Sequence, residues 1–249
     1  MDKYESRFFS TIDIIIIFNY ILVWCLLHRI MNYYKDLWTK PGQEGTKFFY
    51  NVDFNHHYYR LQEHIFREFL KSLKRLVEQE LDGSSVQPPF KNILEVGVGT
   101  GRITRIVWEE LSPDIKWYYG TDINIPDKLE ERFDNRYGNN DMKFQLGWFD
   151  ITDDEFYIQQ RDLKYDLIIA SEIFMHIKPD DMGPVITKLS KLLAPDHGLL
   201  VNIDWYHMPE KSDWFFIHDY DKLYTTNGLT PIYTRDLIEI KQKLFCYGR

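Results

Sequence analysis

The sequence has little cysteine and no excess of basic residues. Its two cysteines, Cys25 and Cys246, provide neither a disulfide framework nor a paired-cysteine metal motif. Reduced thiols in a cytoplasmic compartment are the default interpretation of so low a count. The formal net charge is −8 in 249 residues, which argues against a nucleic-acid partner because neutralising phosphates requires a basic surface. We therefore expect a cytoplasmic protein that binds no nucleic acid and no metal.

The chain also lacks an apolar run long enough for a clear membrane span. The longest run, residues 14–27, reads IIIIFNYILVWCLL and lies between Asp13 and His28. A bilayer requires about 20 apolar residues, and a signal peptide requires a basic start and a small-residue cleavage site that are not present. Three interpretations stay open: membrane association through residues 8–30, a buried or partner-binding helix, or an extension before a working start at Met31.

The rest of the chain divides into two predicted parts after this apolar N-terminal segment, which we place at residues 1–31. A helical cap is expected over residues 32–90, because apolar residues from Tyr58 to Val77 recur at steps of one, three and four positions. A ligand-binding domain is expected over residues 91–249. No internal repeat or low-complexity tract interrupts it.

In this last part, strand-like and helix-like patterns alternate. Strands are expected at residues 92–96, 115–121, 142–148, 165–170 and 198–204, and a β-hairpin at 231–238 and 243–247. Helices are expected at residues 102–111, 128–133, 182–193 and 219–226. Such alternation predicts a doubly wound, Rossmann-like α/β fold. Its seven-stranded sheet would be mostly parallel, with an antiparallel C-terminal hairpin and helices on both faces.

A glycine-rich loop follows the first of these strands. Gly97, Gly99 and Gly101 alternate with Val98 and Thr100, and a helix comes directly after them. Glycines let the chain turn sharply, and they let backbone N–H groups approach a ligand at the positive end of the next helix. Alone, such a loop indicates only a nucleotide, a dinucleotide or a carboxylate ligand.

Acidic residues at the ends of three successive strands narrow the choice of ligand. Glu95 lies two residues before the first glycine, Asp122 ends the second strand and Asp150 follows the third. Asp122 could accept both hydroxyls of a ribose. Asp150 could accept an adenine amino group while Trp148 or Phe149 packs on the ring. The alternatives are that both aspartates only cap helices, and that Glu95 only hydrogen-bonds the loop backbone.

These motifs resemble those of the class I S-adenosylmethionine-dependent methyltransferases. LEVGVGTGR (94–102) resembles their first motif, and YDLIIASEIFMHI (165–177) resembles the fourth-strand motif of the small-molecule branch. LLAPDHGLLV (192–201) resembles the turn that often carries Pro-Gly-Gly, although Asp196 and His197 replace the first glycine. The resemblance covers about residues 91–204.

The resemblance implies S-adenosyl-L-methionine as the cofactor, with the three glycines at its methionine part, Asp122 on its ribose and Asp150 near its adenine. The residues expected to contact the cofactor are Glu95, Gly97, Val98, Gly99, Gly101, Asp122, Ile123, Phe149, Asp150 and Ser171.

The acceptor side is less defined by the sequence. His176 could act as a general base, since its ordinary pKa suits neutral pH, and Glu172 is the rival polar group nearer the strand end. A packed or capping role for His176 stays open. The adjacent histidines at 56 and 57 make a poor metal site, because neighbouring helix positions point in different directions. We expect them to form a lid or entry wall.

The sequence thus favours an enzyme that methylates an oxygen or nitrogen atom of a small-molecule, lipid or glycan acceptor. The tetrapeptide that the family associates with amino-group methylation of nucleobases and glutamine is replaced by ASEI (170–173). Two other hypotheses stay open: a catalytically inactive, methyltransferase-like binding or scaffold protein and, more remotely, a nicotinamide-dependent oxidoreductase.

Overall fold

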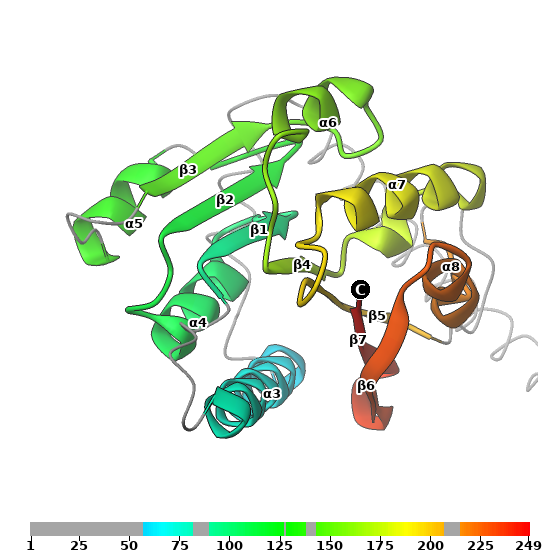
Figure 1. Cartoon of the computed structure of the whole chain (residues 1–249), viewed down its shortest axis with the longest axis horizontal. Coiled ribbons are helices and arrows are strands. Elements are labelled where there is room, and N and C mark those ends of the chain that lie inside the picture. The colour runs from blue at the N-terminus through cyan, green and yellow to red at the C-terminus, as the bar shows by residue number, and fades with distance from the viewer. Residues whose placement is uncertain (1–56, 82–89, 127, 138–142, 207–214) are drawn as a thin grey trace, which may run out of the picture. The chain divides into compact units, whose positions relative to one another are not determined.

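The structure, a computed structural model, describes residues 57–81, 90–126, 128–137, 143–206 and 215–249 (Figure 1). The apolar segment 1–31 and the first part of the expected cap lie outside these residues. The three-segment division and the anchor interpretation therefore stay predictions. None of the described helices combines the length and apolar character needed to cross a bilayer.

One seven-stranded sheet organises the described chain (Figure 1). The strands are β1 (Asn92–Val96), β2 (Trp117–Asp122), β3 (Lys143–Trp148), β4 (Leu167–Ser171), β5 (Leu199–Trp205), β6 (Thr230–Leu237) and β7 (Gln242–Gly248). Their order across the sheet is β3-β2-β1-β4-β5-β7-β6. The first five pair in parallel, and β7 runs antiparallel to both β5 and β6. The predicted fold class, with its antiparallel C-terminal hairpin, is confirmed.

Helices cover both faces of the sheet because its central strands are apolar on both sides. The helices are α3 (His57–Leu81), α4 (Arg102–Leu111), α5 (Leu129–Tyr137), α6 (Asp154–Gln160), α7 (Pro179–Leu192) and α8 (Tyr220–Thr226). Apolar side chains of α3 and α4 share one core cluster, and those of α6, α7 and α8 share the other. The order reverses where β1 lies between β2 and β4, the position at which parallel sheets bind ligands beyond their strand ends.

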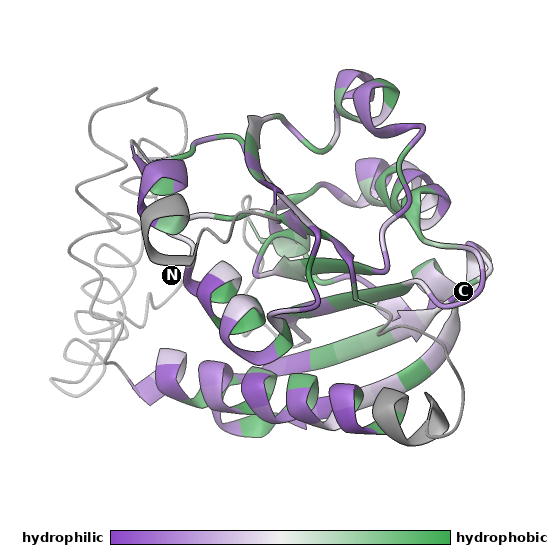
Figure 2. Cartoon of the chain, turned by 60° about the vertical axis from the view of Figure 1, so that its left-hand side comes forward, coloured by the Kyte–Doolittle hydropathy of each residue, from purple (hydrophilic) through white to green (hydrophobic). Residues whose placement is uncertain are grey.

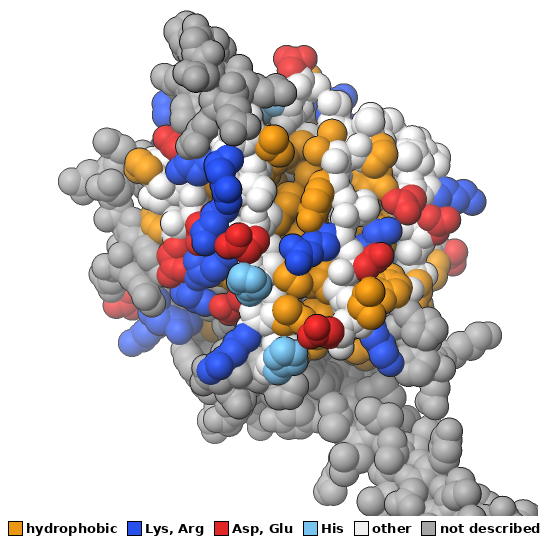
Figure 3. All heavy atoms as spheres, turned by 90° about the horizontal axis from the view of Figure 1, so that it is seen from below, with side chains coloured by type: hydrophobic (Ala, Val, Ile, Leu, Met, Phe, Trp, Pro, Cys, Tyr) orange, Lys and Arg blue, Asp and Glu red, His pale blue; other side chains and the backbone are white. Residues whose placement is uncertain are grey.

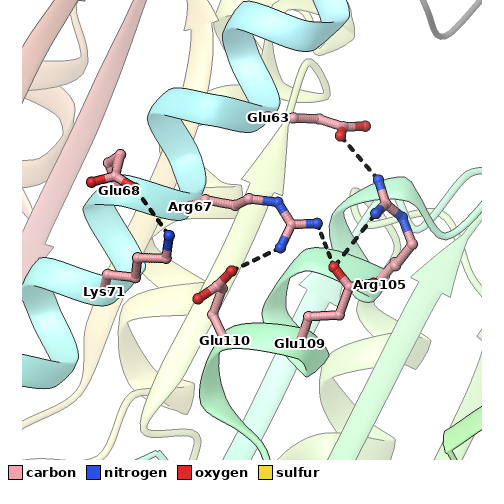
Figure 4. Close-up of polar contacts among 7 residues, drawn as sticks. All are labelled: Glu63, Arg67, Glu68, Lys71, Arg105, Glu109 and Glu110. Carbon is pink, nitrogen blue, oxygen red and sulfur yellow. Dashed lines mark hydrogen bonds and ion pairs between the residues drawn. The ribbon is translucent and has the colours of Figure 1, made fainter.

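The long helix α3 is amphipathic, and its apolar stripe faces the sheet (Figure 2). Phe66 and Leu70 on this stripe are fully buried, and each contributes about 1.5–3 kcal/mol relative to an exposed position. At the edge of the stripe, ion pairs join α3 to α4 (Figure 4). Arg67 contacts Glu109 and Glu110, and Arg105 contacts Glu63 and Glu109.

Three helices differ from the sequence prediction. Helix α5 ends at Tyr137, four residues beyond its expected end at Phe133. The short helix α6 was not among the expected elements, because its seven residues, DEFYIQQ, are too few to show a periodic pattern. Helix α7 begins at Pro179, three residues before the expected start at Met182. Proline occupies its first turn, where the missing N–H has no partner to lose.

Figure 3 shows the molecule from below relative to Figure 1, and this face carries both apolar and charged side chains. Apolar side chains gather near the middle of this face, and lysines, arginines and acidic residues lie around them. Two exposed residues of β6, Ile232 and Tyr233, add to the apolar surface of the molecule. Tyr233 also stacks on Phe69 of α3, with ring centroids 5.6 Å apart, so β6 is tied to the helix layer.

Candidate functional site

The glycine loop between β1 and α4 is a tight turn with three positive backbone angles. Gly97, Gly99 and Gly101 have φ values of +76°, +50° and +79°, a region that residues with a side chain rarely adopt. The Gly97 and Val98 amides donate to the Thr121 carbonyl on β2 at 2.7 and 3.1 Å. The loop is therefore held against the end of the neighbouring strand.

The three glycines are required for different reasons. A Cβ atom at Gly97 would lie 2.0 Å from Ile173, and one at Gly101 would lie 2.3 Å from Phe133. A Cβ atom at Gly99 would meet nothing within 4 Å. The middle glycine thus borders open space in front of the loop, and this space is where a ligand could approach the backbone.

Asp122 connects the loop to β2 and β3. Its Oδ2 accepts a 2.8 Å hydrogen bond from the Gly99 amide, and its Oδ1 accepts one of 3.1 Å from the Asn124 amide. Its carbonyl accepts from the Phe149 amide at 3.1 Å. Burial raises the pKa of Asp122, although the amide hydrogen bonds act in the opposite direction. Each carboxylate oxygen keeps further acceptor capacity for a ribose hydroxyl.

Glu95 points away from the loop and into the α4 side of the sheet. Its Oε2 accepts hydrogen bonds from the hydroxyls of Thr104 and Tyr118, and the residue is almost fully buried. Burial raises its pKa to about 7, against the lowering effect of those hydroxyls and of Arg102. Glu95 thus braces α4 and β2 behind the loop, and a direct contact with the cofactor stays a prediction.

The expected adenine side has one exposed apolar residue and one locally bonded acid. Ile123 is 53% exposed although it is large and apolar. An exposed apolar side chain at this position could pack against an aromatic ring such as adenine. Asp150 is exposed, and its Oδ1 accepts from the amide and the hydroxyl of Thr152 at 2.8 and 2.7 Å. Phe149 packs partly into the core against Phe156.

Two other expected cofactor residues lie on the same strand ends. The Val98 side chain is buried against Ile125 and Leu129, so only its backbone could meet a ligand. Ser171 ends β4, and its buried hydroxyl has no hydrogen-bond partner in the described part of the structure. A buried hydroxyl without a partner is costly and marks a place where a bound group could donate or accept.

Glu172 is the centre of a polar network above β4. Its φ of +60° is uncommon for a residue with a side chain. Its Oε1 accepts hydrogen bonds from the Tyr58 hydroxyl and, at 2.9 Å, from Gln242 Nε2. Its Oε2 lies 3.5 Å from a guanidinium nitrogen of Arg102. Residues of α3, α4 and β7 therefore meet at one strand end.

His176 lies on the exposed side of a short 3₁₀ turn, Phe174–His176, and its ring centroid is 5.0 Å from that of Phe215. Nearby His218 faces inward, and its Nε2 lies 3.0 Å from the Phe174 carbonyl oxygen. Burial lowers the pKa of His218. The structure thus keeps His176 accessible, whereas Glu172 is enclosed by hydrogen-bond donors.

The end of β5 carries a buried acid that the sequence did not single out. Asp204 is fully buried, and its Oδ2 accepts a 3.0 Å hydrogen bond from the Tyr220 hydroxyl. Burial raises its pKa to about 8, and the charge of Glu172 adds to the effect. Within the described residues, histidine, cysteine and carboxylate side chains form no cluster of three or more that could hold a metal.

Comparisons with known proteins indicate a methyltransferase domain. Residues 94–200 match the model of a methyltransferase domain family. The hybrid PKS-NRPS synthetase mpsA of Macrophomina phaseolina (strain MS6) is 27% identical over 171 residues. That match covers 59% of this chain and 4% of the synthetase, so the chain spans a small fraction of that relative's length.

Solved structures of similar fold include several methyltransferases at low sequence identity. The magnesium protoporphyrin IX methyltransferase ChlM of Synechocystis PCC 6803 matches with a TM-score of 0.55 and 15% identity, over 88% of this chain and 94% of that one. The CurJ carbon methyltransferase matches with a TM-score of 0.53 and 18% identity, over 72% of this chain and 53% of that one. The N-methyltransferase NodS of Bradyrhizobium japonicum WM9 matches with a TM-score of 0.50 and 18% identity, over 83% and 97%.

The fold, the glycine loop and the matched domain are together similar to those of the class I methyltransferases. Residues 94–200 carry the sequence pattern of that domain family, and structures of similar fold have been solved with S-adenosylmethionine or S-adenosylhomocysteine bound. The residues present fit that cofactor, since the loop leaves open space at Gly99 and Asp122 stands beside it.

Three residues of the network around Glu172 were missed by the sequence analysis. Tyr58 and Gln242 lie outside the matched domain, and their approach depends on how α3 and β7 pack. Arg102 did carry a signal, because it follows the last glycine of the loop and begins α4. Its interactions with α3 could not be inferred from that position alone.

Proposed function

We propose that this enzyme transfers the methyl group of S-adenosylmethionine to an oxygen or nitrogen atom of a small-molecule acceptor. The acceptor would bind over the carboxyl ends of β4 and β5. NodS, an N-methyltransferase, and an O-methyltransferase family protein share the fold, which supports transfer to nitrogen or oxygen. The sequence leaves lipid and glycan acceptors open, and the test below includes each as a separate substrate panel.

The observation that carries the proposal is the hydrogen bond between Gly99 and Asp122, beside the open space at Gly99. In this proposal the glycine loop holds the methionine part of the cofactor and Asp122 holds the ribose. Ile123 and Phe149 would flank the adenine, with Asp150 at its amino group, and Ser171 would face the bound molecule. When bound, S-adenosylmethionine supplies a methyl group already activated by the sulfonium charge. The protein would therefore contribute mainly proximity and alignment.

On the acceptor side, Tyr58 and Glu172 would have different roles from His176. Burial, followed by the charge of Glu172, raises the pKa of Tyr58 far above its ordinary value, so its hydroxyl stays a neutral donor. Glu172 already accepts two hydrogen bonds, which suits it to positioning groups. The exposed imidazole of His176 is the candidate base for a hydroxyl or a protonated amine.

The test follows a labelled methyl group. The full chain is incubated with methyl-labelled S-adenosylmethionine and separate panels of phenols, carboxylic acids, amines, lipids and glycans. We expect release of S-adenosylhomocysteine together with label in a small molecule, and neither with the Gly99→Val variant. Label confined to lipid or glycan would contradict the acceptor class. Binding of S-adenosylhomocysteine without turnover on any panel would favour the non-catalytic alternative.

A further inference from the structure

The carboxyl group of Asp204 is buried at the end of β5 with one oxygen left open. Its Oδ2 accepts from the Tyr220 hydroxyl at 3.0 Å and from Asn202 Nδ2 at 3.4 Å. The backbone amide of Met175 favours the charged form of the group. Its Oδ1 nevertheless has no hydrogen-bond partner in the described part of the chain, although the residue is fully buried.

The described surroundings of Asp204 do not balance its charge. The groups that act most strongly on this charge are hydrogen-bond donors and the carboxylate of Glu172, and none of them is a cation. Lys243 lies opposite Asp204 in the pairing of β5 with β7, but its ammonium nitrogen lies over the Phe245 ring, 5.0 Å from the centroid. Glu172 therefore adds a second negative charge where a positive one is missing.

Aromatic rings gather on the α8 side of this carboxyl group. The centroid of the Tyr220 ring lies 4.9 Å from that of Phe245 and 6.4 Å from that of Phe174. All three rings are buried. The face of an aromatic ring carries negative partial charge and attracts cations. The rings therefore favour a cation near Asp204, as the two carboxylates do.

Asp204 lies on the acceptor side of the proposed site. Strand β5 pairs with β4 in parallel, and Asp204 is one residue beyond their last paired positions. Met175, whose amide acts on Asp204, belongs to the turn that carries the exposed His176. Beyond Asp204 the chain reaches the surface, since Tyr206 is 38% exposed. The open oxygen is thus next to the strand ends over which the acceptor is proposed to bind.

A buried carboxylate without a counter-charge is costly, because burial removes water from the charge. Burial accordingly raises the pKa of Asp204 to about 8, and strongly shifted groups of this kind cluster at functional sites. A protonated amine would supply the missing charge, a hydrogen bond to Oδ1 and attraction to the ring faces. A neutral hydroxyl would supply only the hydrogen bond, and Glu172 would repel a carboxylate.

We propose that Asp204 selects a methyl acceptor that carries an amine, and that its Oδ1 binds the protonated amine. The assignment rests on the proposed methyl transfer, and it narrows the acceptor to amine-bearing small molecules. Asp204 determines acceptor specificity and takes no part in holding the cofactor.

Three probes with the same ring test the charge that the site prefers: benzylamine, benzyl alcohol and benzoate. Each is titrated by calorimetry into the full chain saturated with S-adenosylhomocysteine. We expect benzylamine to bind about 10- to 100-fold tighter than benzyl alcohol, as a charged hydrogen bond implies, and benzoate to bind most weakly. Asp204→Asn should remove the preference for benzylamine and leave the affinity for S-adenosylhomocysteine unchanged.

Asp221→Asn is the matched control. Asp221 also accepts a hydrogen bond from a tyrosine hydroxyl, that of Tyr247, but it lies exposed on α8. This variant should keep the preference for benzylamine. Loss of the preference in both variants would show that it does not depend on Asp204 in particular, and would overturn the assignment.

Proton release provides a second measurement that needs no variant. Because the pKa of Asp204 is about 8, its carboxyl group is mostly protonated at pH 7, and binding benzylamine as a cation should release nearly one proton. Burial raises the pKa values of Tyr220 and Tyr224 well above their ordinary value and lowers the pKa of His218, so these neighbours stay neutral. The release should decrease as the pH is raised through 8.

Calorimetry in two buffers with different heats of ionisation measures this release. Equal affinity for benzylamine and benzyl alcohol, tighter binding of benzoate, or benzylamine binding without proton release at pH 7 would overturn the assignment and leave the cofactor site standing. A chain that does not bind S-adenosylhomocysteine would instead overturn the proposed function on which the assignment rests.

Discussion

The backbone amide of Gly99 donates a 2.8 Å hydrogen bond to Oδ2 of Asp122, 23 residues further along the chain. This bond joins the turn after β1 to the end of β2. We propose that the methionine part of the cofactor lies against the turn and that its ribose lies against the end of β2. Gly99 keeps open space in front of it, and Asp122 is buried behind it. Gly99 therefore leaves room for the cofactor, and Asp122 provides a carboxylate. Substitutions at the two positions test these two roles separately.

Replacing Gly99 by valine should abolish cofactor binding while the fold survives. The new side chain would enter the open space at the loop, and the φ of +50° adds a strain of about 1–2 kcal/mol. Gly228→Val is the matched control, since Gly228 also has a positive φ, +76°, and open surroundings after α8. Both variants should lose similar stability in urea. Only Gly99→Val should lose S-adenosylhomocysteine in calorimetry, and equal binding by the two would contradict the role of the loop.

Asp122→Asn should weaken both S-adenosylhomocysteine and 5′-methylthioadenosine, by about 10- to 100-fold, because the ribose is common to them. A second signature is pH dependence. Because burial raises the pKa of Asp122, its carboxylate is lost on acidification at a higher pH than the usual value of about 4. Affinity should therefore fall as the pH is lowered through that range. The Asn variant should lack this component, and an identical pH profile in both proteins would exclude Asp122 as the titrating group.

Glu95→Gln should change how stability depends on pH. The pKa of Glu95 is about 7 in the folded protein against 4.5 for the free side chain. Between these values the folded state binds a proton that the unfolded chain has released, so stability decreases as the pH rises from 4.5 to 7. The full loss is about 3 kcal/mol, and it is complete above pH 7.

Glutamine does not titrate, so this loss disappears in the variant. Urea unfolding of both proteins at pH 4.5, 6 and 8 should show Glu95→Gln gaining stability relative to the original chain as the pH rises. A difference between the two proteins that stays constant across this range would show that Glu95 is already ionised in the folded state.

Arg67→Met should cost about 1 kcal/mol, because Arg67 is only 23% exposed and bridges to Glu109 and Glu110. Lys71→Met serves as the comparison, since its pair with Glu68 is about half exposed and should contribute less than the Arg67 bridges. Urea unfolding at low and high salt measures both, and salt should reduce the Arg67 effect. Equal costs for the two variants would show that the bridge between α3 and α4 adds no stability.

Much of the fold follows from local sequence patterns. The alternation of strands and helices defined the sheet and its antiparallel hairpin, and the helix expected at residues 102–111 has those bounds in the structure. Helix α7 begins three residues earlier than predicted, and the first turn of a helix accepts the proline found there. The glycine loop and Asp122 were also predictable, since their spacing reflects one strand–turn–helix unit.

The network around Glu172 could not be predicted in the same way. Tyr58 lies 114 residues before Glu172, and Gln242 lies 70 residues after it, so no local pattern relates them. Glu172 was recognised only as a polar group near a strand end. Its partners depend on how α3 docks and on the antiparallel insertion of β7 between β5 and β6. Such contacts are tertiary, and the order of the strands decides them.

The buried pair of Gln62 and Gln242 has a consequence for synthesis on the ribosome. Their amides hydrogen-bond at 2.9 Å across 180 positions of sequence, and both side chains are fully buried. At about 5–20 residues per second, α3 emerges roughly 10–40 seconds before the strand that satisfies Gln62. During that interval α3 can form as a helix and Gln62 Oε1 can already accept from Arg102, but the acceptor for Gln62 Nε2 does not yet exist. We therefore expect α3 to pack on α4 early and to complete its polar contacts only after β7 has been made.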